Sequence, residues 1–168
     1  MPFSLIPDLV FPSVLDISPE TLRALPVEGV ILDLDNTLAR YSEASIAPDI
    51  TDWLEGLRRA GFSLFVLSNN RRAERLAALL GSLGIRYRLH AKKPAAEGFF
   101  ACARDMGLPP ERIAVIGDQI FTDVLGGNRA RMRTVLVTPR GLYDNPWFAI
   151  RHAIELPFIH ISKRRSRK

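Results

Sequence analysis

Cysteine is almost absent from this sequence, since Cys102 is the only one among 168 residues. A single thiol cannot form an internal disulfide, so no disulfide framework holds this fold. Cys102 lies in the apolar helical segment F-F-A-C-A, which favours a buried structural thiol over a nucleophile or a metal ligand. The three histidines share no metal-ligand spacing, so a nitrogen or sulfur metal site is not expected.

Long apolar runs are missing as well. No stretch of about 18 or more apolar residues occurs, so we expect no transmembrane helix. The first residues have no basic region ahead of their apolar positions, and Pro7 and Asp8 interrupt them early. We therefore expect no secretory signal and a cytoplasmic protein.

Charge is concentrated at the end of the chain. The net charge is +5, and five basic residues stand among the last six positions: Lys163, Arg164, Arg165, Arg167 and Lys168. Without them the chain has no net charge. Such a tail fits contact with an anionic membrane or with nucleic acid, and equally a solvated end. Length and composition are those of one globular domain spanning residues 1–168.

Strand and helix patterns alternate along the middle of the chain. The expected strands are 29–35, 62–68, 87–91, 112–117 and 134–138, and the expected helices are 49–60, 70–83, 95–106 and 122–130. This alternation predicts a three-layer α/β, Rossmann-like fold with a five-stranded, mainly parallel sheet and helices on both faces. Its core covers residues 28–138. An irregular segment, 1–27, precedes it with one short helix near 20–25, and an aromatic and basic extension, 139–168, follows it.

Polar residues follow four of the expected strands at the point where each ends. They are Asp33 and Asp35, Ser68, Lys93, and Asp118 with Asp123. Because ligands of parallel sheets bind beyond the carboxyl ends of the strands, we expect these groups to meet at one edge. Four carboxylates at one place favour a hard divalent cation with oxygen ligands, and Mg²⁺ fits best.

The same set of groups suits the hydrolysis of a phosphate monoester, which is very slow unaided. One carboxylate can attack phosphorus to form an aspartyl-phosphate, and a second can act as acid and then as base. Lys93 and Mg²⁺ would neutralise charge. The hydroxyl of Ser68 and backbone N–H groups near Asn69 and Asn70 would hold phosphoryl oxygens.

These residues also stand in a known order of motifs. The segment D-L-D-N-T-L, residues 33–38, resembles the first motif, D-x-D-x-T, of the haloacid dehalogenase (HAD) superfamily. The resemblance implies that Asp33 is the nucleophile and Asp35 the general acid/base, with the backbone carbonyl of Asp35 also binding Mg²⁺. Thr37, Asn69 and Asn70 are then substrate-binding candidates.

The other three HAD motifs follow along the chain. Ser68 resembles the second and Lys93, in K-K-P, the third, with Lys92 as the alternative bearer of that role. The segment G-D-Q-I-F-T-D, residues 117–123, resembles the fourth, which implies that Asp118 and Asp123 are metal residues.

The spacing of the motifs predicts that no cap domain is present. HAD phosphatases often carry one after the first motif or between the second and third. Residues 36–67 have room for one loop and one helix, and residues 69–92 for one helix and one strand. We therefore expect an open site that suits a large substrate, such as a lipid headgroup, a protein or a nucleic-acid end.

Further segments resemble one branch of the superfamily. The run G-D-Q-I-F-T-D-V-L-G-G-N-R resembles the YqeG-type group, which is similar to the mitochondrial phosphatidylglycerophosphate phosphatases. Two further segments, F-P-S-V-L-D-I and W-F-A-I-R-H-A-I-E, also resemble those proteins. This resemblance implies a phospholipid substrate, with phosphatidylglycerophosphate foremost. Trp147, Phe148, Phe158 and the basic tail would then face a membrane, although for each aromatic residue taken alone packing against the body is slightly favoured.

Three other functions fit parts of the pattern. A receiver-like signalling domain also gathers aspartates and a lysine around Mg²⁺, but its acid pair precedes the phosphorylated residue. A soluble nucleotide or sugar phosphatase would use the same chemistry. A nucleic-acid-associated protein with the HAD fold would act through the basic tail, and the intact acidic set argues against it. The sequence leaves the oligomeric state open.

Overall fold

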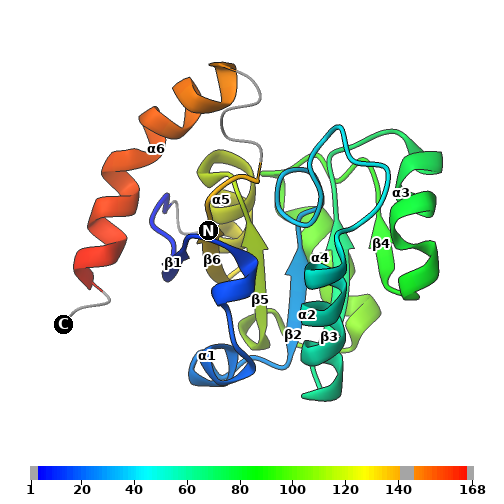
Figure 1. Ribbon diagram of the computed structural model, residues 1–168. Helices are drawn as coiled ribbons and strands as arrows, with labels where there is room; N and C mark the ends of the chain where they lie inside the picture. Colours follow the sequence, from blue (N-terminus) through cyan, green and yellow to red (C-terminus); the bar gives the residue numbers. More distant parts are fainter. Residues whose placement is uncertain (1–3, 141–145, 166–168) are drawn as a thin grey trace.

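One parallel sheet organises the protein. A computed structural model describes residues 4–140 and 146–165 (Figure 1). The described strands are β1 (Leu9–Phe11), β2 (Gly29–Leu32), β3 (Ser63–Leu67), β4 (Arg86–Arg88), β5 (Ile113–Gly117) and β6 (Arg133–Val137). They form a sheet in the order β1-β6-β5-β2-β3-β4, and every described pair is parallel. The expected α/β class is confirmed, with six described strands in place of five.

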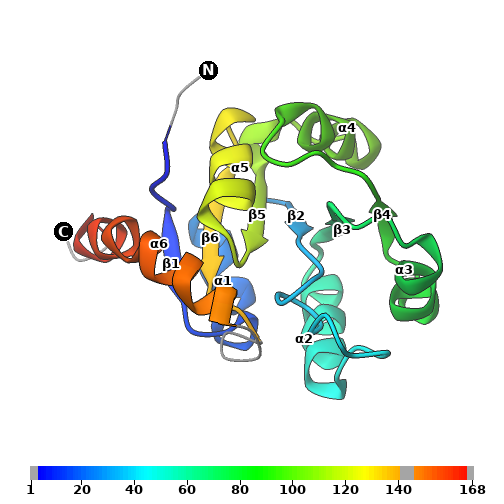
Figure 2. The same ribbon diagram turned by 90° about the horizontal axis from the view of Figure 1, so that it is seen from above.

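Helices cover both faces of this sheet. They are α1 (Pro19–Ala24), α2 (Pro48–Arg59), α3 (Ala73–Leu80), α4 (Ala96–Met106), α5 (Leu125–Arg129) and α6 (Pro146–Arg165). Short turns are η1 (Val14–Asp16), η2 (Gly81–Leu83), η3 (Pro110–Arg112) and η4 (Ile120–Val124). Seen from above, α1 and α2 lie on one face, α4 and α5 on the other, and α6 beside the β1 edge (Figure 2). This is the expected three-layer arrangement.

Two hydrophobic clusters, one on each face, hold the layers together. Val30 and Leu32 of β2 belong to the cluster that includes Leu54 of α2. Ile31, between them, belongs to the opposite cluster with Phe99 of α4. Successive side chains of a strand point to opposite faces, so a strand covered on both sides needs a continuous apolar run. The sequence G-V-I-L meets that need, and all four residues are buried.

Residues 4–27 contain more regular secondary structure than expected. Ser18 caps α1 and Pro19 opens it, in agreement with the short helix expected near 20–25. The expectation of an otherwise irregular segment is wrong, because Leu9–Phe11 forms the edge strand β1 beside β6. Asp8 fixes this pairing, since its carboxylate accepts a hydrogen bond from the backbone N–H of Thr134 at 2.8 Å. A strand of three residues is too short to show a period in the sequence.

Helix α3 begins later than the expected start at residue 70. The backbone N–H of Asn70 donates to Ser68 Oγ at 3.0 Å, and that of Arg72 donates to Asn70 Oδ1 at 2.9 Å. These side-chain acceptors compete with helical hydrogen bonds and keep residues 68–72 in a loop.

Within the C-terminal extension, Pro146–Arg165 forms the helix α6, which was not predicted from the sequence. Ile159 of α6 packs with Ile120 and Leu136 near the β1–β6 edge. The side chains of Trp147 and Phe148 lie outside the described residues, as do residues 166–168 of the basic tail. No helix in the described ranges combines the length and the apolar character that crossing a bilayer requires.

Candidate active site

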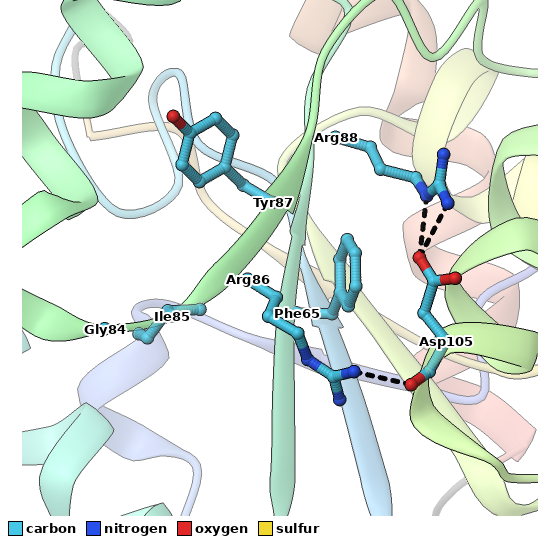
Figure 3. A pocket seen from close by; sticks show the side chains of 7 residues that line it. All are labelled: Phe65, Gly84, Ile85, Arg86, Tyr87, Arg88 and Asp105. Atoms are coloured by element: carbon cyan, nitrogen blue, oxygen red, sulfur yellow. Dashed lines mark hydrogen bonds and ion pairs between the residues drawn. The ribbon is translucent and has the colours of Figure 1, made fainter.

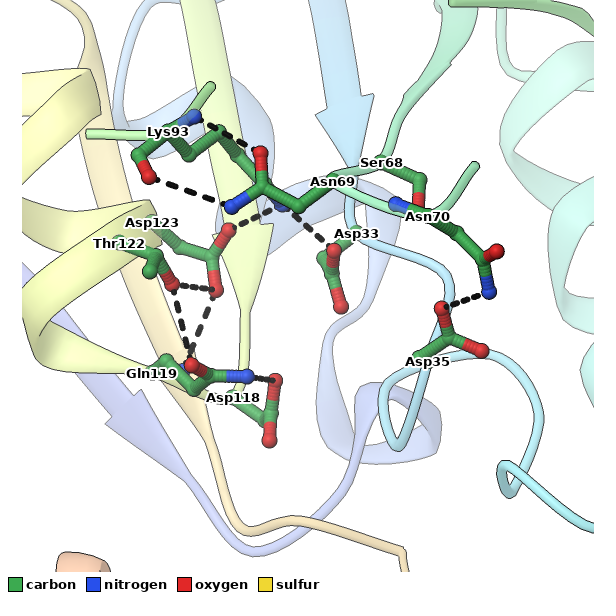
Figure 4. Close-up of polar contacts among 10 residues, drawn as sticks. All are labelled: Asp33, Asp35, Ser68, Asn69, Asn70, Lys93, Asp118, Gln119, Thr122 and Asp123. Atoms are coloured by element: carbon green, nitrogen blue, oxygen red, sulfur yellow. Dashed lines mark hydrogen bonds and ion pairs between the residues drawn. The ribbon is translucent and has the colours of Figure 1, made fainter. Parts of the chain in front are cut away.

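The carboxyl ends of three neighbouring strands bring the motif residues together. Asp33 follows β2, Ser68 follows β3 and Asp118 follows β5. The register of β2 with β3 and β5 pairs Leu32 with Val66 and with Ile116, so all three strands end at the same edge. Figure 4 shows the motif residues converging from these elements and from the loop that carries Lys93.

Lys93 lies at the centre of this site. Its Nζ donates to Asp33 Oδ1 at 2.5 Å and to Asp123 Oδ1 at 2.6 Å, and only 3% of its side chain is exposed. Asn69 holds the Lys93 backbone from both sides: its Oδ1 accepts from Lys93 N at 2.8 Å, and its Nδ2 donates to Lys93 O at 3.2 Å. Lys92 is exposed. Of the two lysines, Lys93 therefore enters the site, and the Asn69 side chain positions it.

Three of the four expected acidic residues form a compact group. One carboxylate oxygen from each of Asp33, Asp118 and Asp123 lies within 4.8 Å of the others, and all three residues are buried. Gly117 allows Asp123 to come this close, because a Cβ at position 117 would lie 2.3 Å from Asp123 Cγ. Buried carboxylates with oxygen atoms at this spacing form a group that can hold a hard cation.

The electrostatics of the group follow from its burial. Desolvation raises the pKa of Asp33 to about 7, against the opposing charge of Lys93 and with support from the charge of Asp123. Burial by itself would lower the pKa of Lys93, but the charges of Asp123 and Asp33 outweigh it and raise that pKa. Lys93 therefore stays positively charged at neutral pH.

Asp35 occupies a separate position. Its carboxylate accepts from Asn70 Nδ2 at 3.0 Å and from Arg75 Nη2 at 3.1 Å, and lies apart from the three-carboxylate group (Figure 4). The guanidinium of Arg75 also donates to the backbone carbonyls of Glu43 at 2.6 Å and Arg40 at 3.0 Å. Sequence reasoning missed Arg75, because nothing in its spacing separates it from the other arginines around it.

Two further residues near the first motif have polar atoms with no partner among the described residues. Thr37 Oγ1 and Arg140 Nε are both buried without a hydrogen bond. The backbone N–H of Arg140 donates to Asn36 O at 2.8 Å, so the segment after β6 reaches the loop that carries the first motif.

Helix α6 contacts the fourth motif directly. Glu155, with 1% of its surface exposed, accepts a hydrogen bond from the backbone N–H of Ile120 at 2.9 Å. Phe158 packs edge-on against Phe121, with ring centroids 6.4 Å apart. The loop between Asp118 and Asp123 is thus supported from outside the sheet, by a segment that carries no motif.

A second concave region lies elsewhere and contains none of the motif residues. It is a hollow of about 470 Å³ beside β4, lined by Phe65, residues 84–88 and Asp105 (Figure 3). Arg88 donates twice to the carboxylate of Asp105, and Arg86 donates to the Asp105 backbone carbonyl. Both guanidinium groups are thus held by contacts within the protein.

The site geometry agrees with a family comparison. The model of haloacid dehalogenase-like hydrolases matches residues 18–131. The chain belongs to the haloacid dehalogenase-like hydrolase family. This HAD-like hydrolase is 35% identical over 161 residues to a Bacillus subtilis protein named probable phosphatase YqeG, a match that covers 95% of this chain and 92% of the relative. The predicted resemblance to the YqeG-type group and the prediction of a HAD-type phosphatase are confirmed.

Two further similarities bear on substrate and fold. The HAD-like hydrolase is 30% identical over 150 residues to phosphatidylglycerophosphate phosphatase 1, chloroplastic, of Chlamydomonas reinhardtii, which covers 84% of this chain but 56% of that relative. It therefore spans just over half of that longer protein. The solved structure of deoxy-D-mannose-octulosonate 8-phosphate phosphatase from Haemophilus influenzae matches with a TM-score of 0.55 and 21% identity, over 82% of this chain and 92% of that one. At this identity the match shows the fold alone.

Proposed function

We propose that this HAD-like hydrolase is a Mg²⁺-dependent phosphatase of a phospholipid headgroup, with phosphatidylglycerophosphate as its substrate. The observation that carries the substrate is the 30% identity to a relative named for that activity, over 84% of this chain. The substrate is an anionic monoester, and the site groups carboxylates with a buried lysine.

The three-carboxylate group suits Mg²⁺. Asp33, Asp118 and Asp123 supply hard oxygen ligands, and Gln119 and Thr122 hold the other Asp123 oxygen, Oδ2, at 3.2 and 3.3 Å. When bound, the ion would neutralise phosphoryl oxygens next to the nucleophile. The carboxylate of Asp35 lies apart from this group, beside Asn70 and Arg75, so any contribution of Asp35 to the metal would come from its backbone carbonyl.

In the first half of the proposed reaction, an oxygen of Asp33 attacks phosphorus and the bond between phosphorus and the ester oxygen breaks. For this step Asp35 has to be in its protonated form, and it gives its proton to the leaving alkoxide. Lys93 orients Asp33 through the 2.5 Å contact and balances charge on the phosphoryl group. Ser68 and Thr37 are hydroxyl donors for phosphoryl oxygens, and the buried, unpartnered Thr37 Oγ1 supports that role.

In the second half, water attacks the phosphorus of the aspartyl-phosphate. Asp35 takes the proton of that water, the bond between phosphorus and Asp33 breaks, and inorganic phosphate leaves with both aspartates restored. Asn70 and Arg75 hold Asp35 from two sides, which favours one orientation of its carboxyl group.

The lack of a cap in the segments between the motifs supports a large substrate. Residues 36–67, all described, contain α2 and the loop before it, and residues 69–92 contain α3, η2 and β4. No cap domain is built from these two segments. A headgroup attached to a membrane can approach a site that no cap domain covers.

The deciding experiment measures phosphate release from phosphatidylglycerophosphate in mixed micelles with Mg²⁺. We expect turnover by the wild type and none by Asp33→Asn. The matched control is Asp52→Asn, which changes an exposed aspartate of α2 and should keep full activity. Turnover of p-nitrophenyl phosphate without turnover of the lipid would keep the chemistry and refute the lipid substrate, in favour of a soluble nucleotide or sugar ester. A stable phosphoprotein without turnover would favour a receiver-like function.

A further inference from the structure

Helix α6 has an inner face that packs against the sheet. Glu155, Ile159 and Ser162, spaced by four and three residues, are all buried. Ser162 Oγ donates to the backbone carbonyl of Pro7 at 2.8 Å, and Glu155 receives the N–H of Ile120. Since residues at this spacing lie on one side of a helix, this side faces the body.

The outer face of α6 is apolar and exposed. Ile150, Ile154 and Ile161 are 52%, 57% and 42% exposed, and Pro157 is exposed between them. Their spacing of four, three and four residues places them along one stripe, turned away from the inner face. The views agree that α6 lies on the outside of the molecule, beyond β1 (Figures 1 and 2). No described residue covers this stripe, and a contiguous exposed apolar stripe marks an interaction surface.

The charge of the chain indicates what covers the stripe. The helix ends in Lys163, Arg164 and Arg165, and Arg167 and Lys168 follow, while the rest of the chain has no net charge. An apolar helix face next to a basic segment is complementary to a bilayer with anionic headgroups. A second copy of this chain offers an apolar stripe but brings the same positive charge.

We infer that the outer stripe of α6, formed by Ile150, Ile154, Pro157 and Ile161, docks on an anionic lipid bilayer. This inference rests on the proposed function, because docking on a bilayer would serve a phosphatase whose substrate is a lipid. Helix α6 touches the loop that bears Asp118 and Asp123 through two contacts, Glu155 to Ile120 and Phe158 to Phe121. A bilayer bound along α6 therefore lies beside the loop that completes the acidic group.

The test is co-sedimentation of the full chain with phosphatidylcholine vesicles that contain or lack phosphatidylglycerol. We expect the wild type to pellet with the anionic vesicles. The combined variant Ile150→Ser, Ile154→Ser and Ile161→Ser should bind them at least about tenfold more weakly. The matched control is Leu15→Ser in η1, which removes a 43% exposed leucine from another part of the surface and should bind like the wild type. Lys163→Gln, Arg164→Gln and Arg165→Gln together should remove the preference for anionic vesicles.

Folding and chemistry are followed separately from binding. All variants should keep the wild-type melting temperature and the wild-type rate on p-nitrophenyl phosphate, because none of the changed residues lies in the acidic site. If the triple isoleucine variant does not fold, Ile154→Ser alone carries the test. Equal vesicle binding by wild type and isoleucine variants, or no binding by the wild type, overturns the inference. A dimer that the isoleucine changes convert to a monomer would assign the stripe to a second copy instead. Vesicle binding without lipid turnover would refute the proposed substrate and leave the docking surface standing.

Discussion

Gly117→Ala is the sharpest test of the site geometry. A Cβ at position 117 would lie 2.3 Å from Cγ, 2.5 Å from Oδ2 and 2.6 Å from Cβ of Asp123. Ordinary contact begins near 3.4 Å, so the Asp123 side chain has to move by about 1 Å. This shift would disturb the 2.6 Å ion pair with Lys93 and the 3.2 Å hydrogen bond from Gln119 N.

The expected magnitudes follow from that displacement. A misplacement of about 1 Å in a catalytic site can cost about a hundredfold in rate, so we expect kcat/KM to fall by about that factor. Mg²⁺ activation should shift to higher concentration as well. Because the added methyl group is forced into a packed region, the free energy of unfolding should fall by about 1–3 kcal/mol. Phosphate release over a Mg²⁺ titration and urea unfolding measure the two effects.

A second glycine supplies the control. Nothing lies within 4 Å of a Cβ placed on Gly56, which stands inside α2. Gly56→Ala should therefore keep full activity and raise the free energy of unfolding by about 0.5–1 kcal/mol, since alanine favours the helix. If Gly117→Ala keeps kcat/KM and Mg²⁺ activation within about twofold of the wild type, activity does not depend on the exact position of Asp123, and the prediction is refuted.

Three more changes probe the site and the core. Arg75→Met removes two hydrogen bonds to loop carbonyls and the ion pair with Asp35. We expect kcat to fall by about tenfold or more, with a smaller effect from Arg75→Lys, and unchanged steady-state kinetics would contradict this. Mg²⁺ at a hundred times its dissociation constant should raise the free energy of unfolding by about 2.7 kcal/mol, and a thermal scan should show this as a higher melting temperature. Asp118→Asn should abolish the rise. Burial raises the pKa of the Cys102 thiol to about 12, so a thiol reagent at pH 8 should label the native protein only through unfolding, and immediate labelling would show that the thiol is accessible.

The sequence predicted those parts of the fold whose local pattern matches their environment. Strands β2, β3 and β5 are continuous apolar runs because helices cover both of their faces, and such runs are visible without a structure. The polar residues that end these strands were found by the same reasoning. Strand β1 was not, because three residues carry no period and their pairing depends on Asp8 and the free edge of β6.

The parts that escaped prediction depend on long-range contacts. Helix α6 carries apolar residues on its inner and its outer face, so the sequence shows no single amphipathic period there. The hydrogen bonds between the Asn69 side chain and the Lys93 backbone join residues 24 positions apart, and the ion pair of Arg75 with Asp35 joins residues 40 positions apart. Such contacts are fixed only once the strands stand side by side, and their residue types give no hint of the partner.

The balance of charge ties these observations together. Asp33, Asp118 and Asp123 carry up to three negative charges in a buried place, and Lys93 supplies one positive charge. Asp35 is matched separately by Arg75. Burial raises the pKa of Asp33 to about 7, so protonation removes part of this negative charge near neutral pH, and a bound divalent cation would favour the ionised carboxylate. We expect such a site to repel an anionic phosphate ester while no cation is bound. If the proposed phosphatase uses Mg²⁺, we therefore expect the ion to bind before the substrate, while Lys93 keeps its contact with Asp33.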